Sequence, residues 1–262
     1  MRNFGVEIEF ISTYTRNQMC TKILRETGVS VEVANYYNKD NKWRLKHDGS
    51  IASESNFRNG MELVTPILST KEDLETLCKI VEVCDKYGKV NRSCGVHVHT
   101  DITSCGAKPM RKLMKFLCKY EHAINQVLPK SRRGDNNSYC RNTWGGEEMM
   151  WNEFLYLDSR TTTDRLMTKF GRGKWNFQNY VQHGSFENRS HGGTLNSTKI
   201  RNWVKLNQAI VQMCFDKPAT RIYRADTCKT YKLKDMLAEL VRKGYIDNPM
   251  KSYYLNREED LR

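Results

Sequence analysis

The chain has 262 residues, 39% of them hydrophobic, and a formal net charge of +13 from 43 basic and 30 acidic residues. This length and composition are typical of a globular protein with a sizeable core and exclude a disordered chain. No apolar run approaches the roughly 18 residues that a membrane helix needs, so no membrane association is expected. Because a strand-like pattern begins at Phe4 without a signal peptide, we expect a cytoplasmic protein.

Nine cysteines are dispersed along the chain without a C-x-x-C pair. An odd number without metal-ligand spacing indicates reduced thiols rather than a disulfide framework or a structural zinc site. Several fall on apolar stripes of predicted helices, where cysteine behaves as a small hydrophobic residue. We therefore expect buried, unreactive thiols at Cys78, Cys84, Cys118 and Cys214.

The positive charge is concentrated in two segments. Residues 108–133 contain eight lysines and arginines against one glutamate, and residues 160–174 contain five against one aspartate. Focused positive charge attracts polyanions, such as nucleotide phosphates, nucleic acid or an acidic peptide. A solvated face that keeps the protein soluble explains the same composition equally well, so the charge alone does not identify a partner.

Alternating apolar and polar residues predict a series of short strands along the chain. Apolar residues at helical spacing predict helices between and after them. This order is not a repeated β-α-β pattern, so it predicts an α+β fold: a twisted antiparallel sheet with helices packed on one face. The expected strands cover residues 4–10, 29–34, 42–47, 61–65, 96–101, 174–180 and 185–190, and the expected helices cover 70–86, 109–128, 198–214 and 232–243.

The helix over 109–128 shows the clearest division into two faces. Its apolar residues form one stripe, which we expect to be buried. The opposite side carries four lysines, so most of the local positive charge is expected on an exposed helix face: Lys108, Lys112, Lys115 and Lys119.

Ionisable residues recur on strand faces opposite apolar residues. In the first strand, Val6 and Ile8 point to one face, and Glu7 and Glu9 to the other. Strand geometry places two such carboxylates roughly 6–7 Å apart, close enough to serve adjacent metal ions and unfavourable without a cation. An ordinary half-exposed strand with solvated acids explains this one segment at least as well.

Three further strands repeat the arrangement. The strand over 96–101 turns His97, His99 and Asp101 away from its valines, and Glu62 stands opposite Met61 and Leu63. The strand over 185–190 carries Glu187 and Arg189 on one face, followed by His191. If these faces coincide, they form a cavity floor whose carboxylates and histidine suit Mg²⁺ or Mn²⁺, with water and substrate phosphates completing the coordination. The residues of this floor are Glu7, Glu9, Glu62, His97 and Glu187.

Two segments add groups for an anionic ligand. A basic loop at 128–133 follows the long helix, and its arginines have the forked donors that suit phosphate or carboxylate. The strand over 42–47 ends in a turn with Asp48 on the face of Arg44 and Lys46. The chain has no P-loop, no G-x-G-x-x-G and no G-x-S-x-G motif, so a bound nucleotide would not be held by a P-loop.

These segments, in this order, resemble the amidoligase family, part of the carboxylate–amine ligase superfamily that includes glutamine synthetase and glutamate–cysteine ligase. The resemblance covers about residues 4–210, so we expect a catalytic domain over 1–215 and a C-terminal helical extension over 216–262. No single motif is decisive, but the ordered set is specific. It comprises GVEIEF at 5–10, Trp43 with DGS at 48–50, MELVTPIL at 61–68, VNRSCGVHVHTD at 90–101, LPKSRR at 128–133, SYCR at 138–141 and GSFENRSHGGTLNSTKIRNW at 184–203.

The resemblance implies a glutamine synthetase-like catalytic fold and active site, which uses ATP and two Mg²⁺ or Mn²⁺ ions. Glu7 and Glu9 resemble the paired strand carboxylates that bind different metals in that superfamily. Glu62 and Glu187 resemble further metal ligands, and His97 resembles the metal-binding histidine of the H-x-H motif.

The same resemblance assigns the groups around the substrate. Arg189 resembles the arginine that contacts the transferring phosphoryl group, and Arg132 and Glu187 join it as expected catalytic residues. Family members commonly have an apolar residue between this glutamate and arginine; here it is Asn188, which leaves the packing of the strand's buried face open. The residues expected near the nucleotide are His99, Asp48, Lys130, Arg133 and Arg141.

The chemistry implied is transfer of the γ-phosphoryl group of ATP to a carboxylate, followed by attack of an amine on the acyl phosphate. We expect a loop to shield that intermediate from water, with 142–173 as the candidate. Two alternatives stay open. A metal-dependent nuclease or phosphohydrolase fits the same ligands, and a non-catalytic nucleic-acid-binding module explains the charge but not the acidic strand positions.

Overall fold

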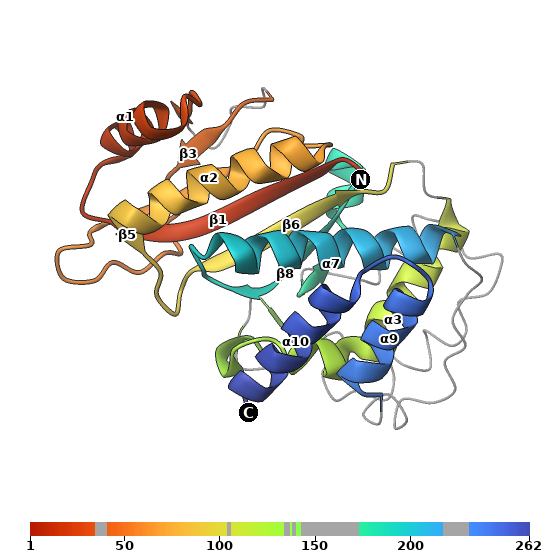
Figure 1. The fold of residues 1–262 in the computed structure, drawn as a ribbon. Coiled ribbons are helices and arrows are strands. Elements are labelled where there is room, and N and C mark those ends of the chain that lie inside the picture. Colours follow the sequence, from red (N-terminus) through yellow and green to blue (C-terminus); the bar gives the residue numbers. More distant parts are fainter. Residues whose placement is uncertain (35–40, 104–105, 134–136, 138–139, 143–172, 217–230) are drawn as a thin grey trace. The chain divides into compact units, whose positions relative to one another are not determined.

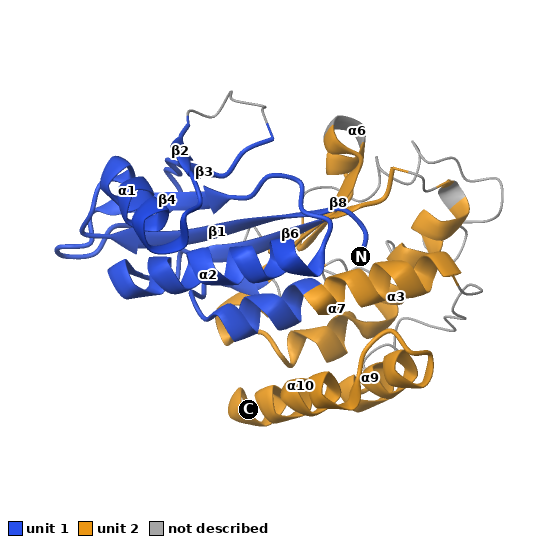
Figure 2. Cartoon of the chain, turned by 45° about the horizontal axis from the view of Figure 1, so that its top comes forward, with its two compact units in different colours: residues 1–99, 191–204 blue, residues 100–190, 205–262 orange. Residues whose placement is uncertain are grey.

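The chain divides into two compact units. Unit 1 comprises residues 1–99 and 191–204, and unit 2 comprises residues 100–190 and 205–262 (Figure 2). Three elements run from one unit into the other: the strands β6 (Gly95–Asp101) and β8 (Ser185–Gly192) and the helix α7 (Ser197–Asp216). The structure, a computed structural model, describes residues 1–34, 41–103, 106–133, 137, 140–142, 173–216 and 231–262.

An open, mostly antiparallel sheet is built around the first strand, β1 (Phe4–Ser12) (Figure 1). β1 pairs antiparallel with β4 (Asn59–Val64) and β5 (Gly88–Lys89), and β4 pairs antiparallel with β3 (Arg44–Lys46). β2 (Glu32–Val33) joins β3 in parallel, the one pair among the described registers that departs from the predicted antiparallel sheet. The described strands follow the order β2-β3-β4-β1-β6-β8-β7, with β5 beside β1.

Two helices pack together in unit 1, and local sequence signals set their ends. α1 (Arg16–Thr27) begins at a capping box between Thr15 and Gln18 and ends at Gly28, whose positive φ of 74° glycine adopts without strain. α2 (Lys71–Tyr87) begins at a second capping box, between Thr70 and Asp73. Its apolar side is buried: Leu74, Leu77, Cys78, Ile80, Val81, Val83 and Cys84.

Unit 2 is mainly helical among its described residues. α3 (Ala107–Asn125) packs against α9 (Leu233–Arg242), and Tyr120 Oη donates to Glu239 Oε2 at 3.2 Å. α10 (Asn248–Asp260) contacts α9, and Arg257 Nε donates to the carbonyl of Val127 at 2.8 Å. The expected extension over 216–262 therefore contributes one helix that packs against α3 and a second that packs on the first, while the domain boundary near 215 stays a prediction.

The four predicted helices are confirmed, as are the strands at 4–10, 42–47, 61–65, 96–101 and 185–190, each within a few residues. At 29–34 only the two residues of β2 pair. The prediction of a strand over 174–180 is largely wrong. Only the two residues of β7 (Trp175–Asn176) are extended, and the short helix α6 (Asn179–His183) follows. The helix ends at Gly184, directly before β8, so this segment forms the turn between two strands. α1 and α10 were not predicted, since each buries only two apolar residues: Met19 and Ile23, and Met250 and Tyr254.

The predicted exposed lysine face of α3 is also wrong in part. Lys108 is exposed, but Lys112 is buried and Lys115 and Lys119 are half-buried. A helical wheel shows which side a lysine occupies but not how its long aliphatic stem lies along neighbouring groups. For Lys119 the reason is visible, because its ammonium lies 4.5 Å from the centre of the Tyr231 ring.

The described cysteines behave as expected. All seven are free thiols and six are buried, among them Cys78, Cys84, Cys118 and Cys214. Across the described part of the chain, no helix combines the length and the apolar character that crossing a membrane requires.

The contacts of Asn188 show how a polar residue is accommodated on the buried face of β8. Its Nδ2 donates to Asn207 Oδ1 on α7 at 2.7 Å, and both side chains are buried. Its Oδ1 accepts from the Ser190 backbone at 3.0 Å and from Ser190 Oγ at 2.6 Å. A polar residue is tolerated here because the helix above supplies a matching amide.

We expect Asn188→Ala to lower the free energy of unfolding by about 1–3 kcal/mol, because it leaves buried polar groups of Asn207 and Ser190 without this partner. The double variant Asn188→Leu/Asn207→Leu should recover part of that loss. Urea unfolding of the wild type and of both variants measures these differences in stability. Asn188→Ala with wild-type stability would show that the amide pair contributes nothing.

Candidate metal centre

A row of charged residues crosses the sheet of unit 1. The strand registers place Lys46 of β3 opposite Glu62 of β4, and Glu62 opposite Glu9 of β1. Directly opposite residues have their Cβ atoms about 4.5–5.5 Å apart. On β6, His97 continues the row, with its Nε2 3.7 Å from Glu9 Oε1. Four strands thus bring a cation, two carboxylates and an imidazole side by side.

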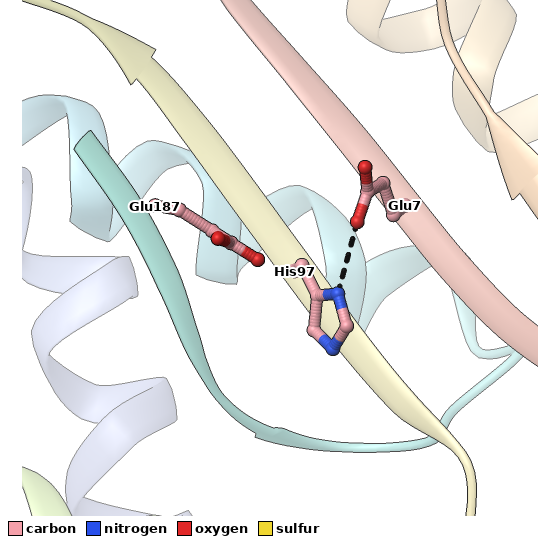
Figure 3. A group of neighbouring side chains, drawn as sticks. All are labelled: Glu7, His97 and Glu187. Atoms are coloured by element: carbon pink, nitrogen blue, oxygen red, sulfur yellow. Dashed lines mark hydrogen bonds and ion pairs between the residues drawn. The ribbon is translucent and has the colours of Figure 1, made fainter. Parts of the chain in front are cut away.

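Glu7 lies two residues before Glu9 and binds both histidines of β6. Its Oε2 is 3.0 Å from His97 Nδ1 (Figure 3), and its Oε1 is 3.5 Å from His99 Nε2. Burial alone would raise the pKa of the Glu7 carboxyl, but the neighbouring imidazoles of His99 and His97 hold it well below its ordinary value. Since Nδ1 of His97 faces Glu7, its Nε2 is the nitrogen available to a metal ion, the arrangement common for metal-bound histidines.

Glu9 is held in one orientation. Its side chain is 6% exposed, and the backbone N–H of Gly95 donates to its Oε2 at 2.6 Å. The other oxygen, Oε1, is the one near His97. Gly95, the first residue of β6, therefore fixes the orientation of the Glu9 carboxylate on β1.

Glu62 lies close to three other carboxylates. Burial, together with the charges of Glu7, Glu9 and Asp48, raises its pKa to about 9, although Lys46 opposes the shift. A divalent cation would relieve this repulsion and favour the ionised carboxylate.

Three of the predicted metal ligands lie close enough together to bind one ion. One ligand atom from each of Glu9, Glu62 and His97 lies within 4.8 Å of the other two. Two carboxylates and one imidazole suit Mg²⁺ or Mn²⁺, which take oxygen ligands and tolerate a histidine. Glu7 is adjacent to this set through His97 and is available as a further ligand.

Glu187 belongs to unit 2, where two amide donors and an ion pair with Arg189 hold it. Asn176 Nδ2 donates to its Oε2 at 2.8 Å and Asn179 Nδ2 donates to the same oxygen at 2.6 Å, while Arg189 Nε is 3.3 Å from its Oε1. The β7–β8 pair sets Asn176 opposite Glu187, and α6 brings Asn179 back toward it. The sequence reasoning missed both asparagines; their signal is the presence of polar residues among the aromatic residues of segment 175–180.

The residues expected near the nucleotide occupy varied settings. Asp48 Oδ1 accepts from the backbone N–H and the hydroxyl of Ser50, both at 2.7 Å, which closes the turn after β3. Arg141 is exposed, and Lys130 is exposed in the short 3₁₀ helix η1 (Lys130–Arg132). Their contacts with a nucleotide, like that of His99, stay predictions.

Two arginines of the basic loop are not simple surface groups. Arg132 is buried, and its carbonyl accepts a hydrogen bond from Cys140 Sγ. The guanidinium of Arg133 donates to the carbonyls of Leu128 at 2.6 Å, Gln126 at 3.3 Å and Leu261 at 2.9 Å. Arg133 thus ties the end of α3 to the C-terminus, and its assignment to phosphate binding stays a prediction. The expected covering loop, 142–173, lies outside the described residues except at its ends.

Comparison with known families decides which family this arrangement belongs to. Residues 1–211 match the model of a family described as "Putative amidoligase enzyme". The chain belongs to this amidoligase family. The match contains all the predicted metal ligands and ends close to the predicted end of the catalytic domain. No curated protein matches the chain.

The raised pKa of Glu62 gives a testable pH dependence. With its ordinary pKa of 4.5 in the unfolded chain and a pKa of about 9 when folded, the carboxyl binds its proton more tightly in the folded state. Its contribution to stability is therefore complete at acid pH and is lost as pH rises toward 9. We expect metal-free wild type to lose stability relative to Glu62→Gln across this range.

Urea unfolding with a chelator at about pH 5, 7 and 9 measures this difference. Glu259→Gln, which changes an exposed glutamate, is the control and should follow the wild type. Parallel stability curves for the wild type and Glu62→Gln would contradict the raised pKa.

Proposed function

We propose that this amidoligase-family protein joins a carboxylate to an amine at the expense of ATP, through an acyl phosphate and with two divalent metal ions. The observation that carries the proposal is the row of Glu62, Glu9 and His97, in which like charges are held together as a cation site requires. The family match supports an amide-forming enzyme. We further propose the glutamine synthetase-like fold, which the open, mostly antiparallel sheet supports.

The protein residues would prepare the site in distinct ways. Glu9, Glu62 and His97 would hold one ion, and Glu7 would serve a second, since the resemblance implies that the paired carboxylates of the first strand bind different metals. Glu187 is proposed as a further ligand, also on the resemblance. The bound ions supply neutralisation of the charge that develops during phosphoryl transfer. Gly95 would keep Glu9 oriented through its N–H, and Glu7 would keep His97 oriented through Nδ1.

The reaction balances without a protein nucleophile. An oxygen of the substrate carboxylate attacks the γ-phosphorus of ATP, forming the acyl phosphate and releasing ADP. The amine nitrogen then attacks the carbonyl carbon, inorganic phosphate leaves with the C–O bonding pair, and the nitrogen loses a proton. Arg189, whose side chain is 26% exposed, would stabilise the transferring phosphoryl group.

We expect Glu9→Gln and His97→Ala to abolish metal-dependent ATP turnover and to weaken Mn²⁺ binding, because each removes a ligand from the row. Isothermal titration with Mn²⁺ and measurement of ADP release test the two effects separately. Glu72→Gln and His122→Ala, which change exposed residues of the same types, serve as matched controls. Wild-type turnover in folded Glu9→Gln or His97→Ala would refute the metal assignment.

Arg189→Lys keeps the charge but loses the forked donor. We expect kcat to fall by roughly 10²–10³-fold, as for the loss of one donor to a transition state, with nucleotide affinity nearly preserved. Arg201→Lys is the control, because Arg201 forms a similar pair with Glu75, whose side chain is 54% exposed. An unchanged kcat would remove Arg189 from the mechanism.

The ligase assignment has its own test in the wild type. Hydroxylamine should trap the acyl phosphate as a hydroxamate, and ADP release should require a carboxylate, supplied as a mixed metabolite extract and identified by mass spectrometry. ATP cleavage that needs no carboxylate and gives no hydroxamate would instead favour the phosphohydrolase.

A further inference from the structure

The basic residues of α3 differ in how their charges are satisfied. The ammonium of Lys119 lies over the rings of Tyr120 and Tyr231, 4.9 and 4.5 Å from their centres. Arg111 and Lys115 are half-buried and, throughout the described part of unit 2, have neither an acidic nor an aromatic partner. Nη1 of Arg111 is buried without a hydrogen-bond acceptor among the described residues.

This pair is unfavourable as it stands. Residues four apart on a helix lie on the same side, with Cβ atoms about 5–6 Å apart, so the two positive charges repel each other. A buried donor without an acceptor adds a desolvation cost. Burial lowers the pKa of Lys115, and the charge of Arg111 lowers it further. Within the described residues, the helix therefore keeps two neighbouring cations without an anionic partner.

We infer that Arg111 and Lys115 form a binding site for a phosphate group. A guanidinium presents forked donors that match phosphate oxygens, and an ammonium adds a second positive charge from the next turn. A phosphate carries close to two negative charges near neutral pH, which matches the charge of the pair. Neither residue is among the predicted ligands of metal or nucleotide, and the inference does not depend on the ligase activity.

Isothermal titration with inorganic phosphate at low ionic strength tests the site. The double variant Arg111→Gln/Lys115→Met keeps most of the side-chain volume and removes both charges. We expect its Kd for phosphate to rise by at least about tenfold, because charge-assisted hydrogen bonds to phosphate are lost. Lys119→Met removes a lysine from the same helix whose charge the tyrosines already satisfy, so it should leave the Kd unchanged.

An unchanged Kd in the double variant, or an equal loss in Lys119→Met, would overturn the site. Titration with metal-free ATP in the same variants distinguishes two sources of the phosphate. If the affinities for ATP and for inorganic phosphate fall together, the group belongs to the nucleotide. If only the affinity for inorganic phosphate falls, it belongs to another phosphorylated substrate.

Thermal unfolding distinguishes the loss of a phosphate site from a loss of side-chain packing in the variants. Without phosphate, the single variant Lys115→Met should melt at or above the temperature of the wild type, because it removes the repulsion with Arg111. Added phosphate should raise the melting temperature of the wild type and of Lys119→Met but not that of the double variant. An equal rise in all of them would mean that phosphate binds elsewhere.

Discussion

Carboxylates that stand side by side on one face of a sheet repel each other, and the site in unit 1 is organised around this repulsion. The β1–β4 register sets Glu9 directly opposite Glu62, and Glu7 lies two residues away on the same strand. Each carboxylate meets the repulsion differently: Glu7 through two imidazoles, Glu9 through the N–H of Gly95, and Glu62 through a raised pKa. The arrangement is costly without a cation and favourable with one, which is the property that a metal site needs.

Unit 2 holds its predicted metal ligand, Glu187, in another way. Glu187 accepts from the neutral amides of Asn176 and Asn179 on one oxygen and lies beside Arg189 on the other. Its orientation is therefore fixed by two amide hydrogen bonds on one oxygen and an ion pair with Arg189 on the other. Supporting groups of this kind, which hold a ligand rather than bind the metal, set the geometry of metal sites nearly as much as the ligands do.

Local periodicity explains what could be predicted from the sequence. Alternation along a strand is enough to assign Glu7 and Glu9 to one face, and helical spacing identifies the buried side of α3. Lys46 and Asn176 could not be placed beside Glu62 and Glu187 in this way, because strand register is set by contacts distant in sequence.

The errors have the same physical origin. α1 and α10 bury too few apolar residues for periodicity to reveal them, although a capping box precedes α1 and an aspartate cap precedes α10. The lysines of α3 were expected to be solvated. Their exposure depends on which other elements pack against the helix, and a helical wheel does not include those elements. Motif order located most of the candidate site, while the donors that support it came only from tertiary structure.

The C-terminal helices lie beyond the family match, yet they take part in shaping the basic loop within it. Arg257 of α10 donates to the carbonyl of Val127, and Arg133 donates to that of Leu261, so the segment that follows α3 is held from both directions. Both carbonyls lie just after the end of a helix, where the chain has left the helical hydrogen-bond pattern, and these guanidinium groups supply their donors. The guanidinium of Arg133 is engaged by backbone carbonyls, and the side chain of Arg132 is buried. Of the basic side chains of this loop, the exposed Lys130 is therefore the one that a phosphate could reach without rearrangement.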